Sequence, residues 1–92
     1  MCRNIRVLHH FEPPTTKEEI HDAALQFVRK VSGLNKPPRA DEEAFARAVD
    51  DVARSTEQLL ASLHPRASAR TREQEREKAR ARWKQREAQL AR

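Results

Sequence analysis

The sequence predicts an all-α protein: an antiparallel helical hairpin, preceded by a short N-terminal extended segment and followed by a basic C-terminal helical arm. Charged residues make up 36% of the 92-residue chain, and Ala, Glu, Arg and Leu, all good helix formers, recur along it. The chain has a single glycine, whereas all-β folds need several glycines for their turns. Apolar residues also recur at helical spacing in two separate stretches. A chain of this length forms one domain with a thin core.

The N-terminal part has no helical pattern. Ile5-Arg6-Val7 alternates apolar and polar residues, which is typical of a short extended segment. Pro13-Pro14 then excludes a helix, because proline lacks the backbone donor and disfavours helical geometry in the preceding residue. We therefore expect residues 2–12 to lie against the helices as an extended cover.

The first helix is predicted at 17–32. Thr16 and Glu19 fit a capping box, in which each side chain accepts a hydrogen bond from the other residue's backbone amide. Gly33 can adopt the left-handed conformation that ends many helices. The expected apolar seam has 4-3-4 spacing and consists of Ile20, Ala24, Phe27 and Val31.

The second helix is predicted from the N-cap Asp41 to Leu63, before Pro65. Its apolar seam has alternating spacings of four and three, with one polar interruption, and consists of Phe45, Val49, Val52, Thr56, Leu59 and Leu63. Two such seams favour antiparallel packing of the two helices. We expect Phe27 and Phe45 each to be buried against the facing helix.

The charge distribution divides the chain into a helical head at 1–63, a hinge at 64–70 and a basic helical arm at 71–92. Residues 1–67 carry ten Lys/Arg and ten Asp/Glu, whereas residues 68–92 carry nine and four, so the whole net charge of +5 lies in the C-terminal quarter. Thr71 with Gln74 forms a possible capping pair at the start of the arm. A cationic arm on a neutral head indicates an anionic partner.

The candidate binding residues surround the only tryptophan. At 100° per residue, a narrow apolar line that contains Trp83 is flanked on both sides by cations. Arginine matches phosphate with a planar pair of donors, and tryptophan can stack on a base. The predicted nucleic-acid site, on DNA, RNA or a ribonucleoprotein such as a ribosome, consists of Arg76, Lys78, Arg80, Arg82, Trp83, Lys84 and Arg86. An alternative is a merely solvated helix with ion pairs such as Glu73–Arg76.

A metal or thiol function would use Cys2, His9 and His10, which are weak candidates. Structural zinc sites need four ligands at characteristic spacing, and the chain has neither a CxxC nor an HxxxH motif. A single cysteine cannot form an internal disulfide, and no apolar run approaches a membrane span of ~20 residues. We therefore expect a cytoplasmic protein without a metal, a cofactor or a membrane partner.

The sequence favours a binding protein over an enzyme. The adjacent carboxylates Glu18/Glu19 and Asp50/Asp51 would point about 100° apart on a helix, so neither pair forms an acid–base dyad. No nucleotide-binding, metalloprotease or nucleophile motif occurs. Besides nucleic-acid binding, one alternative is a protein-interaction module or a homodimeric helical bundle that uses the heptad seam.

Three stretches resemble one protein family: Met1–Arg6, Phe11–Pro14, and Ala24–Gly33 followed by Lys36-Pro37. In them the chain is similar to a small bacterial family catalogued as domain of unknown function number 2277, whose members begin MCRNI. The resemblance covers about residues 1–63, and Lys78–Arg82 resembles the tails of the family. The resemblance implies a bacterial protein, and it does not imply any particular activity.

Overall fold

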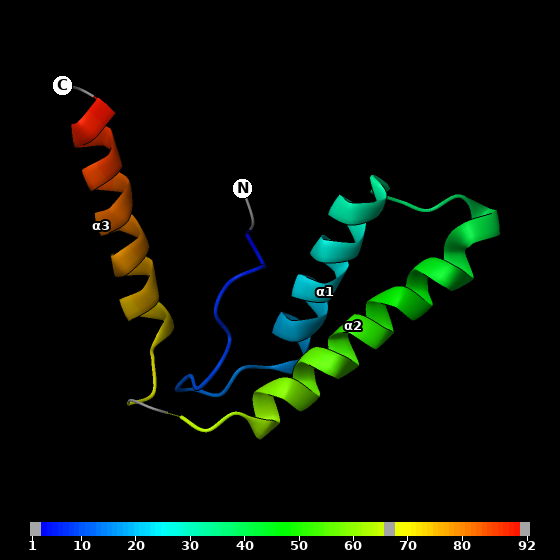
Figure 1. The fold of residues 1–92 in the computed structure, drawn as a ribbon, viewed down its shortest axis with the longest axis horizontal. Coiled ribbons are helices and arrows are strands. Elements are labelled where there is room, and N and C mark those ends of the chain that lie inside the picture. The colour runs from blue at the N-terminus through cyan, green and yellow to red at the C-terminus, as the bar shows by residue number, and fades with distance from the viewer. Residues whose placement is uncertain (1–2, 66–67, 91–92) are drawn as a thin grey trace. The chain divides into compact units, whose positions relative to one another are not determined.

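The computed structural model describes residues 3–65 and 68–90, and it confirms the all-α class (Figure 1). Its elements are α1 (Lys17–Ser32), a short 3-10 helix η1 (Arg39–Asp41), α2 (Glu42–Ser62) and α3 (Arg72–Leu90), and the described residues contain no strand. The chain forms two compact units. Unit 1 consists of Met1–His9 and Thr15–His64, and unit 2 of His10–Pro14 and Pro65–Arg92. Residues 10–14, which the sequence assigned to the head, thus group with the arm.

Helix α1 has the predicted bounds and the predicted caps. The Glu19 amide donates to the Thr16 hydroxyl at 3.2 Å, and the Thr16 amide donates to the Glu19 carboxylate at 2.9 Å. Gly33 adopts a φ of 75°, and its amide donates to the Arg29 carbonyl at 2.9 Å. Both ends of α1 are therefore set by local hydrogen bonds that the sequence encodes.

Helix α2 starts where predicted, after Asp41, but without the predicted side-chain cap. Asp41 occupies the N-cap position, but its side chain makes no capping hydrogen bond. The reason is that Asp41 ends the 3-10 turn η1 with φ −108° and ψ 0°, whereas a side-chain cap normally requires an extended backbone at that residue. At the other end, Leu63 is extended and its amide donates to the Leu59 carbonyl at 3.1 Å.

The core of unit 1 lies between α1 and α2, which run antiparallel as a hairpin (Figure 1). Its centre is small: Ala24 and Val49 are each 4% exposed, and Val28 is buried beside them. Partly buried residues surround this centre, namely Leu25, Phe45, Ala48, Val52 and Ala53. Small side chains at the centre let the two helices approach closely.

The predicted seams are wrong in detail. In α1 the buried line is Ile20, Ala24 and Val28, whereas Phe27 is 46% exposed and Val31 is exposed. Each four-residue step turns about 40° beyond a full helical turn, whereas a 4-3 pair of steps stays within about 20°. The buried line of α1 therefore curves away from the predicted seam after Ala24 and reaches Val28 instead of Phe27. The same rotation occurs in α2, whose seam ends on half-buried Leu60, while Leu59 and Leu63 are exposed.

Residues 3–9, the described N-terminal part of unit 1, contact the hairpin through several bends, whereas residues 10–12 of the expected cover belong to unit 2. The side-chain oxygen of Gln26 accepts from the backbone amides of Asn4 at 2.9 Å and Ile5 at 3.0 Å. Further along, Arg6 pairs with Glu19 at 3.1 Å, and the Thr15 hydroxyl donates to the Leu8 carbonyl. The Leu8 side chain is buried.

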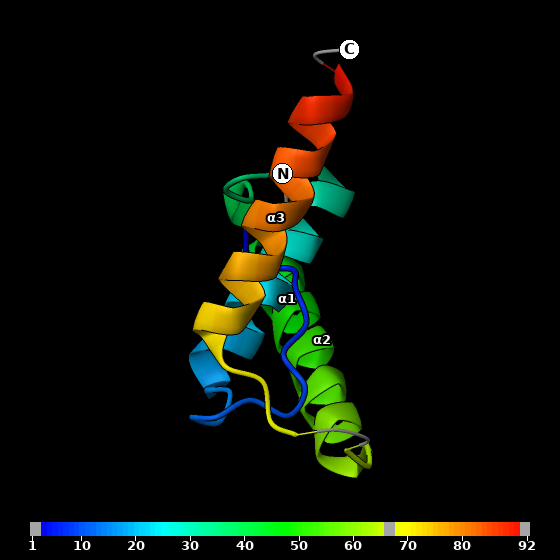
Figure 2. The ribbon, with the colours of Figure 1, turned by 90° about the vertical axis from the view of Figure 1, so that its left-hand side faces the viewer.

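Unit 2 joins residues 10–14 to the start of α3. Phe11 and Arg70 form an isolated parallel bridge. In it the Glu12 amide donates to the Arg70 carbonyl at 2.8 Å, and the Arg70 amide donates to the His10 carbonyl at 2.9 Å. From Arg72 onward α3 is one uninterrupted helix (Figure 2). Within the described part of the chain, no helix is long and apolar enough to cross a membrane.

Candidate nucleic-acid interface

All seven predicted binding residues lie on α3, and every one of them is exposed. No described residue of α3 is buried, and the Trp83 side chain is 51% exposed. The helix therefore contributes no core to the fold, and its side chains are available to a partner. The segment Lys78–Arg86 carries five cations and no acidic residue, and we refer to it below as the cationic segment.

The cations of this segment form two rows on either side of Trp83. Successive residues of an α-helix are about 100° apart, so positions one and three residues away lie about 100° and 60° from Trp83. Arg82 and Arg86 therefore form one row, and Arg80 and Lys84 form the other. The rows mirror one another because cations occur at positions −3, −1, +1 and +3 from the tryptophan.

Each row contains a pair of like charges at i and i+4, and Lys78 lies a further four residues before Arg82. Such pairs destabilise a helix by roughly 0.2–0.5 kcal/mol, because residues four apart are neighbours on the helix surface with Cβ atoms about 5–6 Å apart. The acidic residues of α3 lie outside the cationic segment: Glu75 pairs with Lys78 at 3.8 Å at its edge, and Glu87 follows Arg86. The helix thus carries repulsion that an anionic partner would relieve.

Glu87 contacts the candidate site, although it is not among the residues predicted from the sequence. The Trp83 indole nitrogen donates to the Glu87 carboxylate at 2.8 Å, one turn further along α3. This bond restrains the ring of a side chain that is 51% exposed. The i, i+4 spacing of a donor and an acceptor on one helix is the signal that could have revealed it.

Arg72 ties the first turn of α3 to residues 11–14. Its guanidinium donates to the Pro13 carbonyl at 2.8 Å and to the Pro14 carbonyl at 3.3 Å, and it lies 5.3 Å from the centre of the Phe11 ring. Arg70 pairs with Glu75 at 3.5 Å. These contacts hold one end of α3, whereas the cationic segment lies beyond them.

The predicted capping pair of α3 is present. The Thr71 amide donates to the Gln74 side chain at 3.2 Å, and the Gln74 amide donates to the Thr71 hydroxyl at 3.1 Å. Two otherwise unpaired amides are thus satisfied locally at the end where the helix starts.

Two of the three weak metal candidates, His9 and His10, lie among the described residues. Cys2 lies outside the described residues. His9 is partly buried in unit 1, and His10 is exposed at a positive φ of 58° in unit 2. Among the described residues no group of three or more His, Cys, Asp or Glu side chains could hold a metal ion.

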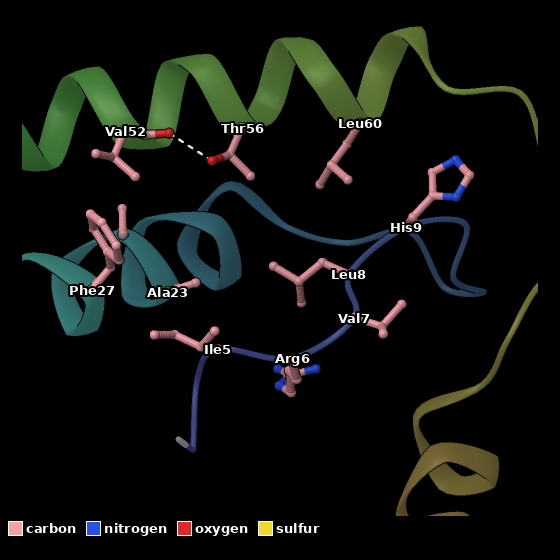
Figure 3. Close-up of a pocket in the computed structure, with 11 residues that line it drawn as sticks. Ile5, Arg6, Val7, Leu8, His9, Ala23, Phe27, Val52, Thr56 and Leu60 are labelled. Carbon is pink, nitrogen blue, oxygen red and sulfur yellow. Dashed lines mark hydrogen bonds between the residues drawn. The ribbon is translucent and has the colours of Figure 1, made fainter. Parts of the chain in front are cut away.

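Unit 1 carries an open apolar pocket that the sequence did not predict (Figure 3). Its volume is about 390 Å³, and it lies between the N-terminal segment, α1 and α2. Val52, Thr56 and Leu60 extend into it from α2, and the Thr56 hydroxyl donates to the Val52 carbonyl at 2.7 Å. The rest of its wall consists of Ile5, Arg6, Val7, Leu8, His9, Ala23, Ala24 and Phe27.

The fold and the site together define a small helical protein with a neutral hairpin unit and a basic helix. The chain belongs to the family described as an uncharacterized conserved protein (DUF2277), whose model matches residues 1–78. The match covers the hairpin, the bridge between residues 10–14 and Arg70, and the first turns of α3, and it ends at the first residue of the cationic segment. No curated protein and no solved structure matches the chain.

Proposed function

We propose that this is a non-enzymatic, cytoplasmic protein that binds nucleic acid or a ribonucleoprotein, such as a ribosome, through α3. The observation that supports the proposal is the composition and exposure of the cationic segment. Five cations on nine exposed residues have no acidic residue among them, and each of the five has another cation four residues away. A helix that only needed to be solvated would gain stability from alternating signs, because opposite charges at i and i+4 attract.

The chemistry of the rows suits a phosphate backbone. Three of the four row residues are arginines, and the planar guanidinium forms two parallel hydrogen bonds to phosphate oxygens. Binding several phosphates releases condensed counterions, which makes the affinity strongly dependent on salt. Trp83 adds an exposed aromatic surface between the rows for contact with bases.

A five-residue variant tests this proposal. Replacing the cations of the segment with glutamine removes five positive charges and keeps good helix formers in place. We expect the variant to lose most of its binding to labelled RNA and DNA at low salt, measured by fluorescence anisotropy. The substitutions are Lys78→Gln, Arg80→Gln, Arg82→Gln, Lys84→Gln and Arg86→Gln.

The matched control removes five exposed cations from unit 1, so that both variants have the same net charge. Its substitutions are Lys17→Gln, Lys36→Gln, Arg39→Gln, Arg47→Gln and Arg54→Gln. The control should retain binding. Equal losses in the two variants would mean that only net charge matters, and absence of binding by the unmodified protein at low salt would reject the proposal.

The pocket of unit 1 favours a second candidate function, self-association into a helical bundle. Phe27 at its wall is 46% exposed, and Leu59 and Leu63 are exposed on α2. A two-helix hairpin buries little apolar area alone, and pairing of two hairpins would bury more. Light scattering across micromolar concentrations should then show a dimer that Phe27→Ser dissociates. A monomer at every concentration would remove this candidate.

A further inference from the structure

The two rows of the cationic segment carry information about the shape of the anionic partner. A flat anionic surface or a single strand meets one face of a helix, and one row would serve it. In α3 the cations lie on both sides of Trp83, at about 60° and 100° in each direction. The partner must therefore present negative charge on both sides of the helix at once.

We propose that α3 lies in the major groove of B-form duplex DNA, with Arg82 and Arg86 on the phosphates of one strand and Arg80 and Lys84 on those of the other. This inference rests on the proposed nucleic-acid function and specifies its ligand. The major groove of B-DNA is about 12 Å wide and admits an α-helix, whose diameter with side chains is about 10–12 Å. Its two walls are the two phosphate backbones.

The line between the rows faces the floor of the groove in this arrangement. That line contains Trp83 and, two turns towards the N-terminus, Arg76 at about 20°. Ala79 lies about 40° to one side of it and Glu87 about 40° to the other, where the carboxylate of Glu87 accepts from the indole. Trp83 contacts the base edges, which include the thymine methyl groups. Its bond to Glu87 at 2.8 Å restrains the indole between the rows. Arg76 extends the line and supplies a base or phosphate contact.

Other nucleic acids fit the two rows less well. The major groove of A-form RNA is deep and narrow, so a helix cannot enter it. Proteins that bind single strands stack successive bases on several aromatic side chains, whereas α3 has one tryptophan and no other aromatic residue. Duplex DNA can therefore contact both rows and Trp83 at once, whereas each competing ligand can contact only some of them.

The test compares three ligands of one sequence, namely duplex DNA, duplex RNA and single-stranded DNA, with the full-length protein. We expect duplex DNA to bind at least tenfold more tightly than either competitor at 100 mM salt. Four phosphate contacts predict a fall in affinity of about 150-fold between 50 and 200 mM salt. Protection of guanine N7 from dimethyl sulfate reports occupancy of the major groove, because that atom lies on its edge.

Two double variants test the rows separately. Arg82→Gln with Arg86→Gln leaves one row, and Arg80→Gln with Lys84→Gln leaves the other. Each should reduce the fall in affinity over the same salt range to about 12-fold, the value for two contacts. The matched control is Arg47→Gln with Arg54→Gln, two exposed residues of α2, which should leave the affinity unchanged.

The outcomes separate the groove inference from the proposed function. If duplex RNA or the single strand binds as tightly as duplex DNA, or if one double variant keeps full affinity, the major-groove arrangement is overturned while nucleic-acid binding stands. If guanine N7 stays reactive in the complex, the arrangement is overturned in the same way. If no ligand binds at 50 mM salt, both proposals fail. The circular dichroism of each variant shows whether α3 remains helical.

Discussion

The centre of the hairpin is formed by small residues, although larger apolar ones lie nearby. Ala24 and Val49 are each 4% exposed, whereas Phe27 lines an open pocket and Phe45 is only partly buried. The position of a side chain relative to the facing helix therefore decides its contribution more than its size does. The stability lost on substitution at these positions should therefore depend on how deeply the side chain is buried, more than on how large and apolar it is.

Substitution of Val49 tests this view. Val49→Ala removes two buried methyl-sized groups, at about 0.8 kcal/mol each, and leaves a small cavity, so it should destabilise unit 1 by about 2 kcal/mol. A loss of this size lowers the Tm of a small domain by about 10 °C. Phe27→Ala should cost about 1 kcal/mol or less, because the ring is half exposed in the folded protein. A larger loss from Phe27→Ala in thermal melts would contradict the observed packing.

At the scale of elements, α3 differs from α1 and α2 in the interactions that stabilise it. The hairpin helices are stabilised by the apolar faces that they share, whereas α3 has capping bonds, the bridge between Phe11 and Arg70, and the contacts of Arg72. All of these lie at its first turn. Most helical stability in proteins comes from packing, so the C-terminal turns of α3 should open more readily than the rest.

Hydrogen exchange can measure how the start of α3 is held. Phe11→Ala removes the ring that lies beneath the Arg72 guanidinium and should loosen the bridge. We expect faster exchange of the Glu12 and Arg70 amides, which donate across it. The Gly33 amide, which donates to Arg29 in unit 1, is the internal control. Uniform acceleration at all three sites would show that Phe11 supports the whole fold instead.

The whole molecule combines a neutral unit with a cationic one. Unit 1 carries nine Lys/Arg and nine Asp/Glu, so the net charge of +5 belongs to unit 2. The core residues of the hairpin, such as Ala24, Val28 and Val49, all belong to unit 1. Binding through α3 and folding of the hairpin should therefore be separable.

A truncated chain tests this separation. A protein that ends at Glu77 keeps Arg70, Arg72 and the capping pair, and it loses the cationic segment. We expect its Tm, followed by circular dichroism, to stay within about 2 °C of that of the full chain, since exposed positions contribute little to stability. Its affinity for nucleic acid should be lost. A truncated chain that no longer unfolds cooperatively would show that the hairpin depends on the rest of α3.

The bounds of the helices could be predicted because their signals are local. The capping boxes at Thr16 and Thr71 and the left-handed Gly33 are read from neighbouring residues, and α1 and α3 begin where these predict. The buried face of each helix could not be predicted, because the apolar residues fit both 4-3 and 4-4 spacing. The choice depends on the tertiary contacts of Ala24, Val28 and Val49.

The residue types of the candidate site could be predicted from the sequence, but fewer of the contacts made by its residues could be. The cations and Trp83 are visible in the sequence, and a single helix presents them at regular angles. The bond from Trp83 to Glu87 follows the local i, i+4 spacing of a helix, whereas the pocket of unit 1 and the contact between Phe11 and Arg72 join residues that no local pattern links. The last of these spans about 60 positions of chain, and long-range pairings leave no periodic signal.

The alternation of cations in α3 also makes this helix a substrate for proteases. Trypsin cleaves after lysine and arginine, and the cationic segment offers such a bond at every second residue, from Lys78 to Arg86. Cleavage requires local unwinding, and its rate follows the open population when opening and closing are fast. A ligand in contact with both rows would stabilise the helical form of this segment and so protect these peptide bonds from cleavage. The rate at which trypsin trims the arm would then report how much of the protein is bound, without any label.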